Sequence, residues 1–258
     1  MEKSSEFLRH EPCPNCGSKD NLARYTDGHA FCFGCSHWEP PTDGVLTAKT
    51  KMTTTNHNLS EYKEAEVQAL TARGISEETC AIWGVRVGTF KGQRAHFYPY
   101  YRDGVVVGCK VRGPDKTFSW IGEAAPCLFG EHLWGKGKKI IVTEGEIDAL
   151  TVSQVQGNKW PVVSVPGGAQ GAKKAVAKAL DYLCQFEEVI LMFDMDEPGQ
   201  KAAVECAEIL PVGKAKIASL PEKDPNECLK AGKSDSIIQA IWNARPYRPD
   251  GILSGSEL

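Results

Sequence analysis

The stretch that decides the fold covers residues 139–148 and reads KIIVTEGEID. Its first half is a short apolar run of the kind that forms a strand buried on both faces, and acidic residues follow without a gap. The run VILMF at 189–193 leads into Asp194 and Asp196 in the same way. Two buried strands that both end in carboxylates predict a parallel sheet with a polar site at one edge.

Strands and helices alternate around this pair. Two more apolar strands are predicted at 162–165 and 215–219, and helices are predicted at 146–155, 172–183 and 198–209. This alternation favours an α/β fold, in which helices cover both faces of a mostly parallel sheet. Ligands of such sheets bind beyond the carboxyl ends of the strands, so that edge is where chemistry is expected.

The region before this alternation is rich in strands. Four runs, VRVGTF, RAHFYPY, GVVVGCKVR and KTFSW, lie between residues 85 and 120, and Asp103-Gly104 marks a hairpin turn between the second and the third. A helix is predicted at 64–73, where Gly74 stops it, and Ser76 is the candidate N-cap of another helix.

Length and composition describe a globular chain. Its 258 residues suit one large domain with a small module, and 41% hydrophobic and 24% charged residues are ordinary values for a water-soluble protein. No apolar run reaches 18 residues and the N-terminus lacks the apolar stretch of a secretion signal, so we expect no membrane segment and a cytoplasmic location. The net charge of -3 excludes a uniformly basic nucleic-acid binder but allows a local basic patch.

Four of the 10 cysteines form two Cys-x-x-Cys pairs near the N-terminus. Each pair turns two thiolates toward one point, and two pairs make the tetrahedral sulfur cage of a structural zinc site. Unpaired or redox-active thiols are the alternative, which this spacing disfavours. The predicted zinc ligands are Cys13, Cys16, Cys32 and Cys35. The scattered cysteines are expected to be small buried residues; they are Cys80, Cys109, Cys127, Cys184, Cys206 and Cys228.

Several aromatic residues surround the two cysteine pairs. Exposed aromatic and hydrogen-bonding side chains on such a small ribbon can stack on and read single-stranded bases. His29 and Asp27 are the better candidates for base reading, because a polar Asp-Gly-His turn has little reason to be buried. Phe31 and Phe33 are instead expected to pack over the zinc site.

Acidic residues gather after three of the predicted strands. At one edge of a sheet so many carboxylates repel one another unless cations compensate them, and oxygen-rich sites of this kind suit Mg²⁺ or Mn²⁺. Favourable charges at helix N-termini are the alternative, which explains Glu146 and Asp148 well and Asp194 poorly, since an apolar strand leads into Asp194. The candidates for the metal site are Glu144, Asp148, Asp194, Asp196 and Asp224.

Two further features could contact phosphate. The glycine-rich turn at 166–171 can offer backbone N–H groups, although a tight strand-to-helix turn explains it equally well. Lys110 and Arg112 share one strand face and could meet a triphosphate or a nucleic-acid backbone. No GxxxxGK[ST] motif occurs, so the chain carries no P-loop ATPase.

Glu-Gly-Glu-x-Asp after one strand and Asp-x-Asp after a later strand resemble the Toprim fold of topoisomerases and primases. With a four-cysteine ribbon ahead of it, the pattern is similar to bacterial and phage DNA primases. The segments LTARGISEETC, KVR, VTEGEIDAL and ILMFDMDEPG resemble, in order and spacing, the primase half of the bifunctional primase–helicases of T-odd bacteriophages. The resemblance extends from Cys13 to about Gly251.

This resemblance implies a role for each matching residue. The four cysteines bind zinc, and Glu144 is the catalytic glutamate and a further metal ligand. Asp194, Asp196 and Asp224 engage the divalent metals, with Asp148 in support. Nucleotide contacts are implied for Lys110 and Lys116 as catalytic lysines, and a nucleotide or template contact is implied for Arg73.

The resemblance also implies a function, which is template-directed synthesis of short RNA primers on single-stranded DNA by metal-dependent nucleotidyl transfer. Ribonucleoside triphosphates are the implied substrates, and a replicative helicase and a DNA polymerase are the implied partners. If a phage encodes the chain, its location is the host-cell cytoplasm. A Toprim-type metal-dependent nuclease and a non-catalytic zinc-ribbon protein that binds single-stranded DNA stay open as alternatives.

The same reasoning predicts the division of the chain. We expect an all-β zinc ribbon at 1–45 and, because the next segment is rich in Pro, Thr, Asn and Lys, a flexible linker at 46–60. A primase RNA polymerase domain is predicted at 61–245 and the start of another linker at 246–258. The polymerase domain is expected to contain an N-terminal subdomain at 61–135 and a Toprim subdomain at 136–245.

Overall fold

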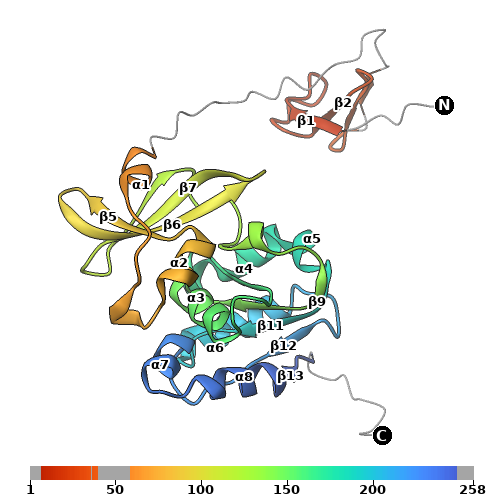
Figure 1. Ribbon diagram of the computed structural model, residues 1–258. Coiled ribbons are helices and arrows are strands. Elements are labelled where there is room, and N and C mark those ends of the chain that lie inside the picture. Colours follow the sequence, from red (N-terminus) through yellow and green to blue (C-terminus); the bar gives the residue numbers. More distant parts are fainter. Residues whose placement is uncertain (1–6, 36, 40–58, 249–258) are drawn as a thin grey trace, which may run out of the picture. The chain divides into compact units, whose positions relative to one another are not determined.

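The computed structural model describes residues 7–35, 37–39 and 59–248, and the chain divides into two compact units, Met1–Thr55 and Asn56–Leu258 (Figure 1). The predicted linker at 46–60 and the predicted linker start at 246–258 lie largely outside the described residues. Each unit has a hydrophobic core of its own.

The first unit is a four-stranded antiparallel sheet in the order β1-β2-β3-β4. Its core is very small, because it consists of Leu22, Ala30 and two of the metal-site cysteines, Cys13 and Cys32. A core of this size gains most of its stability from a bound metal. The strands are β1 (Phe7–Glu11), β2 (Leu22–Tyr25), β3 (Ala30–Cys32) and β4 (Trp38–Glu39).

The second unit begins with short helices and an antiparallel sheet in the order β5-β6-β7-β8. The predicted Asp103-Gly104 hairpin joins β6 to β7, and Ser76 caps α2 by accepting a hydrogen bond from the Thr79 N–H (3.2 Å). The elements are α1 (Ser60–Glu64), η1 (Thr71–Arg73), α2 (Glu77–Trp83), β5 (Arg86–Phe90), β6 (Gln93–Arg102), β7 (Val105–Arg112) and β8 (Phe118–Gly122).

The prediction of a helix at 64–73 is wrong. The chain leaves α1 after Glu64, and Glu66 instead exchanges both backbone hydrogen bonds with Val87 (3.1 and 2.8 Å). Pairing with the neighbouring strand therefore outweighs the helical propensity of this segment. Only its last three residues form a helical turn, η1, which Gly74 ends with a positive φ of 67°.

The C-terminal part of the second unit contains a five-stranded sheet in the order β10-β9-β11-β12-β13. Its first four strands are parallel, and β13 pairs antiparallel with β12. The register pairs Thr143, the last residue of β9, with Met192, the last residue of β11, so both strands end at the same edge. The strands are β9 (Gly137–Thr143), β10 (Val162–Ser164), β11 (Phe186–Met192), β12 (Ala215–Ile217) and β13 (Arg245–Pro246).

Helices cover both faces of this sheet (Figure 1). Alternate strand residues face alternate cores: Ile141 and Ile190 pack with α3 and α8, whereas Val142 and Leu191 pack with α4 and α6. The predicted helix at 172–183 starts earlier and is divided at Ala179. The helices are α3 (Glu146–Val155), α4 (Gly168–Lys178), α5 (Leu180–Leu183), α6 (Glu197–Ala207), α7 (Pro225–Lys230), α8 (Ser234–Trp242) and a turn, η2 (Glu131–Leu133).

One continuous core joins the antiparallel sheet to the five-stranded sheet. Trp83, Tyr98, Tyr100 and Phe129 are buried between them, and the Trp83 indole N–H donates to Ser153 on α3 (3.1 Å). The expectation of buried cysteines is confirmed at Cys80, Cys109, Cys206 and Cys228, but it is wrong for Cys184, which is exposed, while Cys127 is half-buried. No helix in the described part of the chain is long and apolar enough to cross a membrane.

Candidate active site

The four cysteines of the first unit converge on one point. The Sγ atoms of Cys13 and Cys35 lie 3.7 Å apart, and those of Cys16 and Cys32 are also 3.7 Å apart. All four sulfurs lie within 4.8 Å of one another. Tetrahedral zinc with bonds of about 2.3 Å places its sulfurs about 3.8 Å apart, so the spacing fits this metal. The predicted zinc ligands are therefore brought together as a closed structural site.

The base-reading candidates form an ordered turn in the first unit. Asp27 Oδ1 lies 2.6 Å from Nδ1 of His29, and the imidazole stacks on the Tyr25 ring at 4.1 Å with an interplanar angle of 9°. The imidazole of His29 is thus fixed by ring stacking on one side and by the Asp27 carboxylate on the other.

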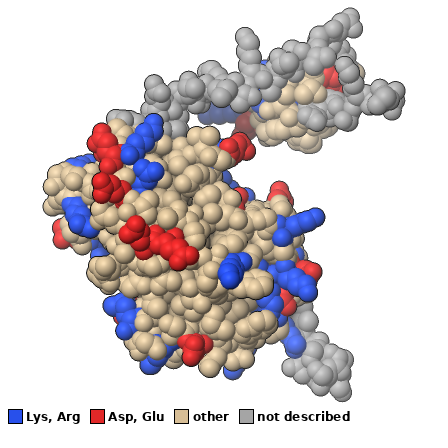
Figure 2. Space-filling view, viewed as in Figure 1, with Lys and Arg blue, Asp and Glu red and all other residues tan. Residues whose placement is uncertain are grey.

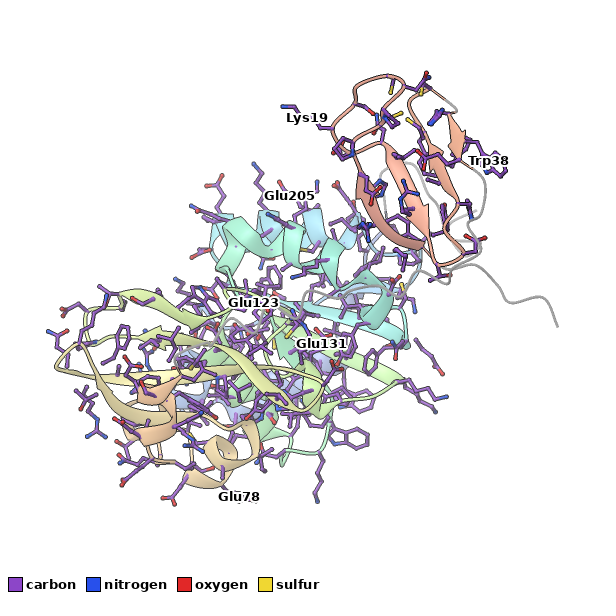
Figure 3. The ribbon with its side chains drawn as sticks, turned by 90° about the horizontal axis from the view of Figure 1, so that it is seen from above. Lys19, Trp38, Glu78, Glu123, Glu131 and Glu205 are labelled. Atoms are coloured by element: carbon purple, nitrogen blue, oxygen red, sulfur yellow. The ribbon has the colours of Figure 1, made fainter. Side chains whose placement is uncertain are left out.

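The expectation that Phe33 packs over the zinc site is wrong. Its side chain is 66% exposed and touches the half-buried Phe31 edge to face at 5.2 Å. Trp38 is also exposed and points away from the ribbon (Figure 3). Small residues and the cysteines already fill the core, so these larger rings remain on the surface.

Glu144 lies at the end of β9 and is fixed from two sides. Its Oε1 accepts a hydrogen bond from the backbone N–H of Ala169 (3.1 Å), and its Oε2 accepts a longer one from the N–H of Asp194 (3.4 Å). The first donor lies in the first turn of α4, which contains the last four residues of the glycine-rich segment at 166–171. That segment therefore orients Glu144, a role that its sequence alone did not reveal.

Asp194 and Asp196 follow β11 and share one cation. The ammonium of Lys223 lies 3.3 Å from Oδ2 of Asp194 and 3.2 Å from Oδ2 of Asp196. Oδ1 of Asp196 caps α6 by accepting from the N–H of Gly199 (3.0 Å). The ammonium of Lys223 thus lies between two carboxylates, where a metal cation could also bind. Because its side chain is more than half exposed, Lys223 has room to move away from them.

Two carboxyl groups of the cluster are held in an unfavourable environment. Burial, and then the charge of Glu144, raise the pKa of Asp194 to about 6. Burial, together with Asp224 and Asp194, raises the pKa of Asp148 well above its usual range. Several carboxyl groups therefore meet at this edge with too few protein cations to balance them. Such a set of oxygen ligands fits a divalent cation.

The spacing of the carboxylates sets a limit on how they bind a metal. Among the described residues, only the four cysteines form a group of three or more His, Cys, Asp or Glu whose ligand atoms all lie within 4.8 Å. Asp224 is turned toward its own helix, since Oδ1 caps α7 through the N–H of Glu227 (2.7 Å). Mg²⁺ retains several waters and uses one or two carboxylates directly, which suits this wider arrangement.

Lys110 reaches the same cavity but is not free. A cavity of about 410 Å³ is lined by Lys110, Arg112, Glu144, Asp148 and Asp194, with Gly167 and Gly168. The ammonium of Lys110 donates to both oxygens of Glu146 (2.8 and 3.0 Å) and to the carbonyl of Pro166 (2.8 Å). Glu146 lies in the first turn of α3, as its interpretation as a helix N-terminal charge requires, and it is in addition the partner of a buried lysine.

The remaining predicted contacts, Arg73, Arg112 and Lys116, line a second cavity of about 280 Å³. Two residues that sequence reasoning missed, Arg94 and His96, line it as well. The signal was present, because the two residues alternate on β6 and His96 pairs directly with Arg112 on β7. Elsewhere the surface carries interspersed acidic and basic side chains, as Figure 2 shows for one face.

Comparisons with known proteins agree with this architecture. Three family models match in chain order: the zinc-binding domain of primase-helicase over residues 8–45, the bacteriophage T7 DNA helicase/primase N-terminal a+b fold over 65–122, and a Toprim-like domain over 141–229. The DNA helicase/primase of Enterobacteria phage T3 is 45% identical over all of this chain. The chain covers 47% of that relative, about half of its length.

Two solved structures are similar over most of their own length. The primase fragment of the bacteriophage T7 primase-helicase protein shares 45% identity at a TM-score of 0.69, covering 92% of this chain and 100% of that one. The other contains T7 lagging-strand DNA polymerase interacting with primase domains of two gp4 subunits bound to an RNA/DNA hybrid and dTTP. It shares 48% identity at a TM-score of 0.69, and the match covers 72% of this chain and 97% of that one.

Fold and site together define a zinc-ribbon and Toprim protein of the DNA primase class. The chain belongs to the primase family represented by the T3 and T7 primase–helicases. The predicted α/β Toprim core and the all-β zinc ribbon are thereby confirmed.

Proposed function

We propose that this chain synthesises short RNA primers on single-stranded DNA from ribonucleoside triphosphates. The observation that carries this proposal is the shared cavity in which Glu144, Asp148 and Asp194 face Lys110 and Arg112. Carboxylates that hold divalent metal beside cations that hold phosphate are the two requirements of nucleotidyl transfer. Family membership supports the same reaction.

Each residue of the cavity has a part in this proposal. Glu144, Asp194 and Asp196 would hold Mg²⁺ or Mn²⁺, with Asp148 and Asp224 supporting the site. When bound, the metal supplies a lowered pKa for the attacking 3′-hydroxyl and stabilises the negative charge of the pyrophosphate leaving group. The turn at 166–171 keeps Glu144 in place, and Lys110 and Lys116 hold phosphate groups of the nucleotide.

The first unit is proposed to read the template. Its ordered turn sets His29 and Asp27 beside the Tyr25 ring, which suits stacking on an unpaired base and hydrogen bonding to its edge. Structural zinc at the four cysteines would maintain that turn. Arg73 and Arg112 are proposed to contact the nucleotide or the template in the second unit.

The partners follow from the relatives. A replicative helicase is proposed because the T3 relative is a DNA helicase/primase, and a DNA polymerase is proposed because T7 primase domains interact with one. The host-cell cytoplasm is the corresponding proposed location if a phage encodes the chain. The proposed helicase partner rests on the longer T3 relative, of which this chain covers about half, whereas the proposed polymerase partner rests on primase domains that this chain covers to 97%.

The test is primer synthesis on a panel of short single-stranded templates, with zinc and Mg²⁺ varied. Oligoribonucleotides that appear only with Mg²⁺, and only on templates that carry a particular short signal, would support the proposal. Cleavage of the template without oligoribonucleotides would indicate a metal-dependent nuclease instead. Template binding with neither product would indicate a non-catalytic binding protein.

A further inference from the structure

The second cavity lies at one corner of the antiparallel sheet and is strongly basic. Its charged or ionisable lining groups come from η1, β6, β7 and the loop that follows β7, and none of the described residues that line it is an Asp or a Glu. They are Arg73, Arg94, His96, Arg112 and Lys116. Four full positive charges therefore surround about 280 Å³ of space.

Strand register explains why these charges meet. Arg94 and His96 are two residues apart on β6, and His96 lies directly opposite Arg112 on β7, so the three side chains share one face of the sheet. Arg94 and Arg112 thus add two positive charges to the same side of the sheet, where they line one cavity. Cations gathered in a cavity favour a negatively charged ligand.

The cations of this cavity lack the carboxylate partners found elsewhere. Arg24 is paired with two glutamates at 2.7 and 2.8 Å, and Arg102 with Glu123 at 2.8 Å. Over the described ranges, no Asp or Glu oxygen lies within 4.0 Å of the charged atoms of the four cationic side chains, which are Arg73, Arg94, Arg112 and Lys116.

Neutral groups orient these side chains without cancelling their charge. Gln68 accepts a hydrogen bond from Arg94 (2.9 Å), and Asn226 accepts one from Arg73 (3.4 Å). His96 lies 3.3 Å from the Tyr98 hydroxyl. Burial, and then the charges of Arg112, Arg94 and Arg73, lower the pKa of His96.

We propose that this cavity binds the 5′-triphosphate of the nucleotide that starts the primer, with Arg94 and His96 as part of the binding site. The proposal rests on the proposed function. A nucleoside triphosphate carries close to four negative charges at neutral pH, since the second pKa of a terminal phosphate is about 6. A template backbone brings only one charge per nucleotide, which matches a compact group of four cations less well.

The position of the cavity distinguishes the first nucleotide from the second. Arg112 lines both this cavity and the one that contains Glu144 and Asp194, so the two are neighbours. The 3′-oxygen of the first nucleotide attacks the α-phosphorus of the second, whose bond to pyrophosphate breaks. The first nucleotide keeps its triphosphate, which must therefore lie beside the carboxylate cluster and outside it.

The experiment compares two primers for extension by the whole chain on one matching template. One is a dinucleotide with a 5′-triphosphate, and the other is the same dinucleotide with a 5′-hydroxyl. We expect kcat/KM to favour the triphosphate by about tenfold, the usual effect of a charge-assisted hydrogen bond or two. Arg94→Gln is expected to reduce this preference to within about twofold.

Arg102→Gln is the matched control, because Arg102 occupies the opposite end of the same strand and is paired with Glu123. It removes the same charge and should retain the full preference. The inference is overturned if the unmodified chain has no preference, or if Arg94→Gln lowers kcat/KM equally for both dinucleotides. A matching drop in single-stranded DNA affinity, with a salt slope smaller by about one, would assign Arg94 to the template backbone.

These outcomes separate this inference from the proposed function. If the unmodified chain extends neither dinucleotide, the proposed primase activity fails. If it extends both equally well, only the triphosphate site fails.

Discussion

The buried pair of Lys110 and Glu146 is the residue-scale feature that most constrains the active site. The two charged groups have side chains only 11% and 6% exposed, and Tyr100 donates a further hydrogen bond to Glu146 (2.7 Å). The carbonyl of Pro166 accepts from Lys110 as well, so the pair connects β7 with α3 and with the glycine-rich turn. Changes at Lys110 therefore act on stability and on chemistry at once.

Lys110→Ala is expected to destabilise the fold by about 3–5 kcal/mol, because it leaves Glu146 buried with its charge unpaired. The double variant Lys110→Met, Glu146→Gln should recover most of that loss, since both charges are removed together. Neither the single nor the double variant is expected to synthesise primers, because both lack the lysine. Urea unfolding and primer assays on the single and double variants check this prediction, and equal stability of the two would contradict it.

At the scale of elements, helix N-termini hold the carboxylates in place. Asp196 caps α6 and Asp224 caps α7, while the first turn of α4 holds Glu144 through the N–H of Ala169. The start of α6 is especially crowded, because a Cβ on Gly199 would lie 2.4 Å from the carbonyl oxygen of Asp194. The backbone of the site is therefore as closely specified as its side chains.

Gly199→Ala is expected to lower stability by about 2 kcal/mol or more and to reduce primer synthesis, since the added methyl group displaces the Asp194 backbone. Gly171→Ala is a suitable control, because its Cβ meets nothing within 4 Å and alanine favours the helix α4 in which it lies. Thermal melts and initial rates of both variants test this. A normal Gly199→Ala enzyme would contradict the role given to α6.

The sequence predicted those parts of the fold and site that depend on short-range patterns of apolar and acidic residues. Apolar runs followed by acids located Glu144 and Asp194, because parallel strands end at one edge regardless of the details of packing. It missed Arg94 and His96 as site residues, since only strand register brings them beside Arg112. It also missed α7 and α8 and placed a helix at 64–73, where the backbone pairing of Glu66 with Val87 decides the structure.

At the scale of the whole molecule, template reading and catalysis are proposed to lie on different units. The small first unit contains the cysteine cluster and the turn that carries Asp27 and His29, and the second contains the carboxylate cluster and the basic second cavity. Their cores share no residues. A substitution that unfolds one unit should therefore leave the other unit folded.

Cys35→Ser is expected to unfold the first unit and leave the second folded, because three sulfurs hold zinc poorly and the first core has little else. The variant should still extend a supplied diribonucleotide but should lose template-sequence preference at initiation. Melting curves and synthesis on templates with and without the preferred signal measure both effects. Initiation as selective as that of the unmodified chain would place sequence reading in the second unit.

The edge formed by β9 and β11 is proposed to carry out metal-dependent nucleotidyl transfer. The most direct measurement is the rate of dinucleotide formation in Mg²⁺ by the unmodified chain and by Glu144→Gln, with template affinity and melting temperature measured in parallel. We predict a loss of about a thousandfold or more in rate, with folding and template binding retained. A Glu144→Gln variant that forms dinucleotides at the unmodified rate would contradict the claim.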